Sequence, residues 1–196
     1  MVACEAMDPL DLLHLDVVAS ARQMIGWTLV SHAGGATTSG VIVETEAYRA
    51  ADDPAAHAYR GRTVRNAPMW LGAGTIYVYR SYGLHHMLNF VTGVSGAPES
   101  VLIRAIEPVI GIQFMQERRG LEPLRSLTSG PAKLTQAMAI DVSLTGTNLG
   151  TMLNLIPPDR KILESDVTSA KRIGISSGKD LPWRFYAINN PYVSRH

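Results

Sequence analysis

The chain has 196 residues, a length that fits one ordinary domain with a sizeable hydrophobic core. Hydrophobic residues make up 46% of it and charged residues 18%, which is typical of a globular protein in solution. The single cysteine, Cys4, excludes an internal disulfide and any multi-cysteine zinc or iron–sulfur site. No stretch reaches the roughly 20 apolar residues of a spanning helix, and the N-terminus lacks a basic and then apolar leader. We therefore expect one domain, residues 1–196, in the cytoplasm and away from membranes.

The net charge of +1 does not by itself indicate a nucleic-acid partner, but the charge is unevenly distributed. Between Pro54 and Pro98 there is no aspartate or glutamate, whereas four arginines and three histidines fall in this segment. A chance gap in acidic residues would give this pattern. A surface kept free of negative charge because it faces phosphates would give it as well.

The first part of the chain predicts a helix, two strands and a long loop. Asp8 is a capping residue before Pro9, and apolar residues then recur at helical spacing until Gly26, which predicts one helix. The two strands are predicted over residues 27–32 and 40–48, and the loop over residues 49–73.

The second part predicts further strands and two helices. Glu107-Pro108 predicts a helix start, and the arginines before Gly120 suit its last turn, because cations are favoured at a helix C-terminus. Strands joined mostly by short turns, with helices outside them, predict an α+β fold: a single domain with a curved, largely antiparallel β-sheet and peripheral helices. The remaining elements are strands over residues 75–82, 88–92 and 100–106, a helix over residues 130–139, and strands after residue 152.

Glu44, Glu46 and Tyr48 share one face of the predicted strand 40–48, because side chains alternate along a strand. A carboxylate near a strand end and beside an aromatic ring has the fixed backbone and partial desolvation that a water-activating base needs. The same pattern is also that of an edge strand with a solvated acidic face. This segment alone leaves both interpretations open.

Tyr77 and Tyr79 share a face of the next predicted strand, and Tyr82 comes at its end, before a glycine that permits a turn. Tyrosines so placed commonly pack in a core. They can also cradle a planar base, and a tyrosine that projects from a turn can enter a base stack.

Arg104 stands in the middle of the apolar strand 100–106, where a cation is costly to bury without a partner. A structural pair with a nearby carboxylate such as Glu107 would satisfy it. A pair with an active-site acid or water would satisfy it equally, so both interpretations stay open.

A series of short motifs follows one order along the chain. They are Val-Glu-Thr-Glu-Ala-Tyr at 43–48, Asp-Pro-Ala-Ala-His at 53–57, Gly-Arg-Thr-Val-Arg-Asn at 61–66, Tyr-Val-Tyr at 77–79, Tyr-Gly at 82–83, Asn89, the strand of Arg104, and Gly-Pro-Ala-Lys-Leu at 130–134. In this order and spacing they resemble the alkyladenine (3-methyladenine) DNA glycosylase family. The resemblance covers nearly the whole chain, from about Asp16 to residues 183–186.

The resemblance implies a DNA glycosylase whose general base is Glu46 and whose Arg104 helps to hold the nucleophilic water. An N-alkylated purine is cationic and leaves readily, so the enzyme must add an aligned water and a negative charge beside the oxocarbenium-like sugar. No lysine occurs from Met1 to Ala132, so none lies near the proposed pocket in sequence to form a Schiff base. We expect a hydrolytic, monofunctional enzyme that leaves an abasic site and needs no cofactor and no metal.

The resemblance also implies a pocket for a nucleotide rotated out of the duplex, which costs a few kcal/mol. Tyr48 and Tyr79 match its aromatic walls, and His57 matches the residue that contacts the flipped nucleotide. Tyr82 matches the tyrosine that fills the gap in the duplex, and Asn89 the floor residue that disfavours the exocyclic amine of guanine. The expected partner is double-stranded DNA that contains damaged purines, bound by a monomer.

Two other functions are compatible with parts of the sequence. The first is a nucleic-acid-binding module that kept the fold without cleavage, which the presence of both Glu46 and Arg104 argues against. The second is a nucleoside hydrolase, which the wedge-like Tyr82 and the acid-free segment 54–98 argue against. Ala50 and Ala132 stand where the family usually has glycine, and the range of substrates is not carried over by the resemblance.

Overall fold

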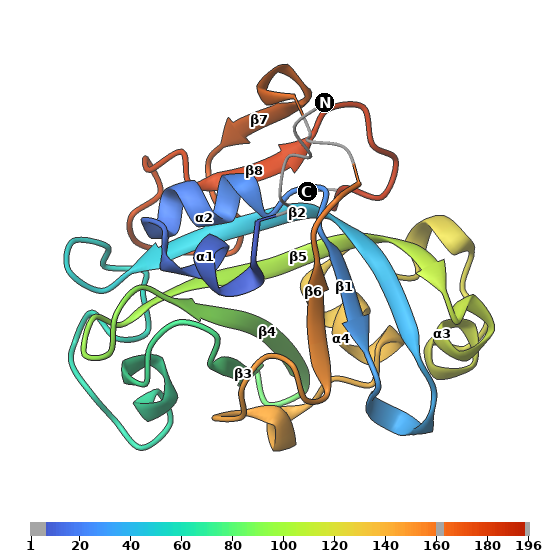
Figure 1. Cartoon of the computed structure of the whole chain (residues 1–196), viewed down its shortest axis with the longest axis horizontal. Helices are drawn as coiled ribbons and strands as arrows, with labels where there is room; N and C mark the ends of the chain where they lie inside the picture. The colour runs from blue at the N-terminus through green and yellow to red at the C-terminus, as the bar shows by residue number, and fades with distance from the viewer. Residues whose placement is uncertain (1–6, 160–162, 195–196) are drawn as a thin grey trace.

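The strands form one sheet in which all neighbouring strands run antiparallel (Figure 1). The computed structural model describes residues 7–159 and 163–194, so Cys4 lies outside the described residues. Within these residues the eight strands are β1 Thr28–Ser31, β2 Thr38–Arg49, β3 Ile76–Ser81, β4 His85–Thr92, β5 Glu99–Ile110, β6 Leu153–Ile156, β7 Val167–Ala170 and β8 Arg184–Ala187. Their order is β3-β4-β5-β2-β1-β6, while β8 pairs with both β2 and β7.

Four α-helices in the described part of the chain lie around this sheet. They are α1 Pro9–His14, α2 Val17–Gln23, α3 Ile112–Arg119 and α4 Pro131–Ala137. In Figure 1, α1 and α2 lie across β2 and β5, whereas α3 and α4 lie together towards the right-hand end of the sheet. This arrangement confirms the predicted α+β fold with an antiparallel sheet and peripheral helices. Over residues 7–159 and 163–194, no helix combines the length and apolarity that a membrane span requires.

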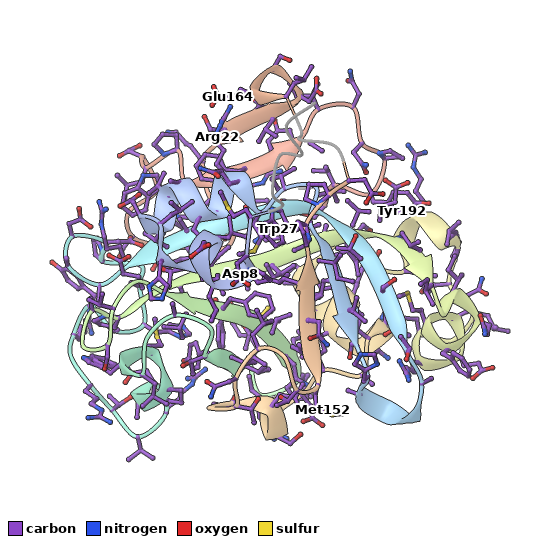
Figure 2. The ribbon with its side chains drawn as sticks, viewed as in Figure 1. Asp8, Arg22, Trp27, Met152, Glu164 and Tyr192 are labelled. Atoms are coloured by element: carbon purple, nitrogen blue, oxygen red, sulfur yellow. The ribbon has the colours of Figure 1, made fainter. Side chains whose placement is uncertain are left out.

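The first predicted helix is interrupted between α1 and α2. Asp16 causes the break, because its carboxylate accepts hydrogen bonds from the backbone N–H groups of Val18 at 2.9 Å and Ala19 at 3.4 Å and so caps a new helix. Arg22 of α2 then donates to the backbone carbonyl of Glu164 at 3.0 Å, and the two residues lie side by side in Figure 2. The second helix is thereby tied to the start of β7.

The predicted helix start at Glu107-Pro108 is wrong, because both residues belong to β5 and pair with β2. The hydrogen bonds between β5 and β2 outweigh the local preference of Glu107-Pro108 for a helix start. The chain leaves the sheet at Gly111, which has a φ of +73°. A Cβ at this position would collide with the carbonyl oxygen of Thr37, so the close approach of the two segments requires glycine.

The alternation of side chains along β2 separates the hydrophobic core from the candidate site. Thr45 faces α2, since its hydroxyl donates to the carbonyl of Ala21 at 2.7 Å. Glu44, Glu46 and Tyr48 point to the opposite face of the sheet, which confirms the prediction that they share a face. The helices α1 and α2 therefore cover the apolar side of β2 and leave its polar side for the site.

Candidate active site

The acidic face of β2 is buried rather than solvated. The side chains of Glu44 and Glu46 are 0% exposed, and β2 is not an edge strand, since it pairs with β5 along one edge and with β1 and β8 along the other. The interpretation of this segment as an edge strand with a solvated face is therefore wrong. Buried carboxylates require hydrogen bonds and opposite charge, and the surrounding strands supply both.

Arg104 of β5 supplies positive charge to both acids. The register of β5 against β2 shifts at a bulge next to Glu44. The Nε of Arg104 donates to Glu44 Oε1 at 2.9 Å, and its Nη1 lies 3.2 Å from Glu46 Oε1. Burial opposes the charge of Arg104, but the two carboxylates outweigh it and raise its pKa. Glu107, the alternative partner considered from the sequence, instead accepts a hydrogen bond from Asn190 at 2.9 Å.

Glu44 is surrounded by fixed protein donors. Arg104 and Arg184 donate to its Oε1 through their Nε atoms, at 2.9 and 2.7 Å. Ser194 donates its N–H to Oε2 at 2.8 Å and its hydroxyl to Oε1 at 2.9 Å. Burial alone would raise the pKa of Glu44, but Arg104, Ser194 and Arg184 together lower it below its ordinary value. These contacts make Glu44 a stabilising group of the site.

Glu46 has fewer partners than Glu44. Its Oε2 accepts from the hydroxyl of Tyr48 at 2.7 Å, and its Oε1 accepts from the N–H of Ile173 at 2.8 Å and faces Arg104. A carboxylate has about four lone-pair positions, so one acceptor position is left for a water molecule. Burial and the negative charge of Glu46 raise the pKa of Tyr48 well above its ordinary value, which keeps the hydroxyl a donor.

A pocket of about 470 Å³ opens beside Glu46 on the same face of the sheet. This volume falls within the roughly 300–1,000 Å³ of ordinary small-ligand sites. Tyr48 and Gly174 line the pocket, and Tyr48 and the neighbouring Ile173 both donate to Glu46, so the carboxylate lies directly behind the pocket wall. Most of the lining comes from the acid-free segment 54–98, and among the described residues that line the pocket there is no aspartate or glutamate.

Aromatic rings from β3 and the loop after β2 meet in this pocket. The rings of His57 and Tyr79 are 4.3 Å apart, those of Tyr77 and Tyr79 are 5.6 Å apart, and His57 Nδ1 lies 3.0 Å from the hydroxyl of Tyr77. Burial raises the pKa of both tyrosines to about 12, so their hydroxyls stay protonated. Burial, and after it the charge of Arg65, lowers the pKa of His57 below 6.5. The three rings themselves are thus uncharged, and neutral aromatic faces suit a planar, cationic ligand.

Asn89 lines the pocket and lies between two backbone carbonyls. It is 3% exposed, and its amide nitrogen donates to the carbonyls of Tyr77 and Met87, each at 3.2 Å. These two bonds fix the orientation of the carboxamide. The lining of the pocket therefore includes a rigid polar group.

Tyr82 stands at the tip of the β3–β4 hairpin, at the pocket rim. Tyr82 has a φ of +50° and Gly83 a φ of +72°, and the N–H of Leu84 donates to the carbonyl of Ser81 at 3.2 Å, which is the geometry of a tight hairpin turn. The side chain of Tyr82 is 92% exposed, and that of Leu84 is 79% exposed. Of the two interpretations left open for Tyr82, core packing is therefore wrong and projection from a turn is correct, and Leu84, given no role from the sequence, projects from the same tip.

The C-terminal segment supplies donors that the sequence analysis left without a role. Ile173 is separated from Glu46 by 127 residues, and Arg184 and Ser194 are separated from Glu44 by 140 and 150 residues. Local spacing in the sequence cannot assign residues to partners so far away. The expected site residues are nonetheless brought together: Tyr48, His57, Tyr79, Tyr82 and Asn89 line the pocket, and Glu46 and Arg104 lie behind its wall.

The side chains around the pocket decide whether a Schiff base or a metal site could form there. Among residues 7–159 and 163–194, no lysine lines it, and no group of three or more His, Cys, Asp or Glu side chains could hold a metal ion. Lys171 is close to the pocket wall in the chain, but its ammonium is largely exposed and pairs with Asp180 at 3.1 Å.

The sequence matches the family model of methylpurine-DNA glycosylase over residues 11–191. A candidate 3-methyladenine DNA glycosylase of Carboxydothermus hydrogenoformans is 49% identical over 181 residues, which cover 92% of this chain and 94% of that protein. Another from Methanoculleus marisnigri is 49% identical over 183 residues, with 92% and 94% covered. One from Francisella tularensis is 44% identical over 193 residues, with 94% and 96% covered. The chain therefore belongs to the methylpurine-DNA glycosylase family, a family of enzymes that hydrolyse N-glycosidic bonds in DNA.

Proposed function

We propose that this enzyme rotates a damaged purine of the 3-methyladenine type out of duplex DNA, hydrolyses its N-glycosidic bond and leaves an abasic site. The family and the names of its relatives support a DNA glycosylase. The observation that carries the finer proposal is the buried carboxylate of Glu46, paired with Arg104 directly behind the wall of an aromatic pocket.

In the proposed reaction the bond between the purine nitrogen and C1′ of the sugar breaks, and its electron pair stays with the base. The oxygen of a water molecule bonds to C1′ and passes a proton to Glu46. An N-alkylated purine is cationic and becomes neutral as it leaves, so this step needs no acid on the base. Arg104 holds the carboxylate in place, and the negative charge of Glu46 stabilises the positive charge that develops on the sugar.

The pocket and the hairpin tip together support binding of a nucleotide outside the duplex. Rotating a nucleotide out of the stack costs a few kcal/mol, and an aromatic side chain that stacks in the gap offsets part of this cost. Tyr82 is exposed at the pocket rim and is in position for such a contact. Because one chain provides both the pocket and the wedge, we propose that it acts as a monomer, which sedimentation of the free and DNA-bound protein tests.

The decisive experiment measures base release from duplex oligonucleotides that contain 3-methyladenine, 1,N6-ethenoadenine or hypoxanthine. Wild type is expected to release at least one of them, and Glu46→Gln is expected to slow release by about 10²–10⁴-fold, the usual contribution of a general base. If wild type releases none of the three, the proposed function fails. If Glu46→Gln releases base at the wild-type rate, the catalytic assignment fails.

The proposed product is tested in the same reactions. A hydrolytic enzyme without a pocket lysine leaves an intact abasic strand and is not trapped on DNA by borohydride. Strand cleavage without added alkali, or a covalent protein–DNA adduct after reduction, would contradict the monofunctional mechanism.

A further inference from the structure

A second buried ion pair lies beside the candidate active site and has no part in the reaction described so far. Arg172 binds Asp53 through two parallel bonds, Nη1 to Oδ2 at 2.5 Å and Nη2 to Oδ1 at 2.7 Å, and both side chains are 0% exposed. Asp53 follows β2 and Arg172 follows β7, so the pair joins two loops at the left-hand end of the sheet in Figure 1. Desolvation of both charges makes such a pair a poor source of net stability, which favours a role in positioning.

Arg172 also holds the part of β2 that carries the proposed base. Its Nη1 donates to the carbonyl of Ala47, the residue between Glu46 and Tyr48, at 2.9 Å. The centre of its guanidinium lies 4.6 Å from the centre of the Tyr48 ring. The same side chain therefore fixes both the backbone of β2 and the ring whose hydroxyl donates to Glu46.

The loop after Arg172 provides the second donor to Glu46. The N–H of Ile173, the next residue, donates to Glu46 Oε1 at 2.8 Å, and residues 174–177 line the pocket. At Gly178 a Cβ would lie 2.7 Å from Asp53 Oδ1 and 2.9 Å from Arg172 Nη2, so the loop is seated tightly on the ion pair. Three groups hold the Glu46 carboxylate. Two of them, the Tyr48 hydroxyl and the Ile173 N–H, thus depend on the ion pair of Asp53 and Arg172.

We propose that Asp53 and Arg172 are positioning residues for base release. The pair holds the hydroxyl of Tyr48 and the N–H of Ile173, and these two donors orient the acceptor position of Glu46 that takes the water. This inference rests on the proposed role of Glu46. A displacement of about 1 Å can cost about 100-fold in rate, so loss of the pair is expected to slow base release by about 10–100-fold.

The test uses the double variant Asp53→Asn with Arg172→Gln, which replaces the ion pair by two amides and leaves no unpaired buried charge. Base release is measured in single turnover with enzyme in excess, over a series of enzyme concentrations, on a lesion duplex that wild type cleaves. The plateau rate reports only on folded, bound enzyme. A partly unfolded preparation raises the concentration needed for half-maximal rate but leaves the plateau unchanged, so a loss of stability is separated from a loss of positioning.

The matched control is Lys171→Gln with Asp180→Asn, which neutralises an exposed ion pair in the same loop and should keep the plateau within about twofold. A plateau reduced about tenfold or more by the Asp53/Arg172 variant supports the proposal. A smaller reduction, or an effect confined to the half-maximal concentration, overturns it. Glu46→Gln in the same assay separates the two proposals: wild-type release by that variant overturns the catalytic assignment of Glu46, whereas wild-type release by the pair variant alone overturns only this inference.

Discussion

At the scale of single residues, Glu44 and Glu46 lie on one face of β2 and are equally buried. They differ in their hydrogen-bond partners. Both side chains are 0% exposed. Glu44 accepts four hydrogen bonds from Arg104, Arg184 and Ser194, all of them fixed protein donors. Glu46 has an acceptor position left for water, so of the two acids it is the one suited to chemistry.

The first prediction concerns the stabilising role of Glu44. Glu44→Gln is expected to lower the free energy of unfolding at pH 7 by about 3–5 kcal/mol, because it removes the carboxylate that Arg104 and Arg184 share. Since the folded pKa of Glu44 lies below its ordinary 4.5, this stabilisation is present above pH 4.5 and is lost as the pH falls through the folded pKa. Urea unfolding of wild type and Glu44→Gln is measured from pH 7 downwards. The difference between their free energies of unfolding should shrink only below about pH 4.5. A difference that does not change with pH would contradict this account.

The second prediction concerns the charge of His57. Because burial and then Arg65 lower its pKa below 6.5, the imidazole is expected to be neutral at pH 7. Arg65→Gln removes the second cause and should move the pKa of His57 upwards, towards 6.5. Histidine-ring NMR titration measures both values, with Arg125→Gln, at a distant surface position, as the control. An unchanged pKa in Arg65→Gln would show that Arg65 does not act on this ring.

At the scale of elements, the strands could be predicted from the sequence. Which strands pair with one another in the sheet could not. Alternation placed Glu44, Glu46 and Tyr48 on one face, and this is correct. Whether β2 is an edge strand depends on β8, which pairs with β2 from the far end of the chain. The local pattern does not contain this pairing, so a solvated edge strand could not be excluded. The helix signal at Glu107-Pro108 failed for the same reason, because pairing with β2 outweighs it.

The candidate site was predicted more completely than the network that supports it. The residues expected from the family resemblance line the pocket or lie directly behind its wall. The contact between Asp53 and Arg172 spans 119 residues, and neither residue's local spacing points to the other. Long-range contacts of this kind follow from the sheet topology and cannot be read from the sequence pattern alone.

The third prediction belongs to the β3–β4 hairpin. Tyr82→Ala is expected to weaken binding to lesion DNA by about tenfold, because base–aromatic stacking contributes roughly 1–3 kcal/mol. Tyr82→Gly should weaken binding as much but should not lower the thermal stability, since a φ of +50° strains any residue except glycine. Fluorescence anisotropy and thermal unfolding measure the two effects, and Tyr82→Phe is the control that keeps the ring. Unchanged affinity in both small variants would make Tyr82 an ordinary surface residue.

At the scale of the whole molecule, the distribution of charge matters more than its sum. The net charge is only +1, yet the segment 54–98 supplies most of the pocket lining and contains no acidic residue. Glu46 and Asp53, two acids beside the pocket wall, are buried and paired with arginines. The pocket lining includes Arg65 and Arg80 and no described acid, so it is locally positive, and we expect attraction to phosphates to be strongest there.

The fourth prediction follows from this asymmetry. Arg60 and Arg62 are exposed in the loop that leads to the pocket wall, so each is expected to neutralise a phosphate when DNA binds. Binding to undamaged duplex should weaken steeply with salt, and Arg60→Gln with Arg62→Gln should reduce the slope of log K against log salt by about 2, about 1 for each phosphate that is no longer neutralised. Arg125→Gln, at an exposed position beside the C-terminal segment, removes the same kind of charge and should leave the slope unchanged. Equal slopes for the double variant and wild type would show that DNA approaches another face. A reduced slope in Arg125→Gln would show that the attraction is spread over the whole surface, because each of these arginines carries the same single charge and only their positions differ.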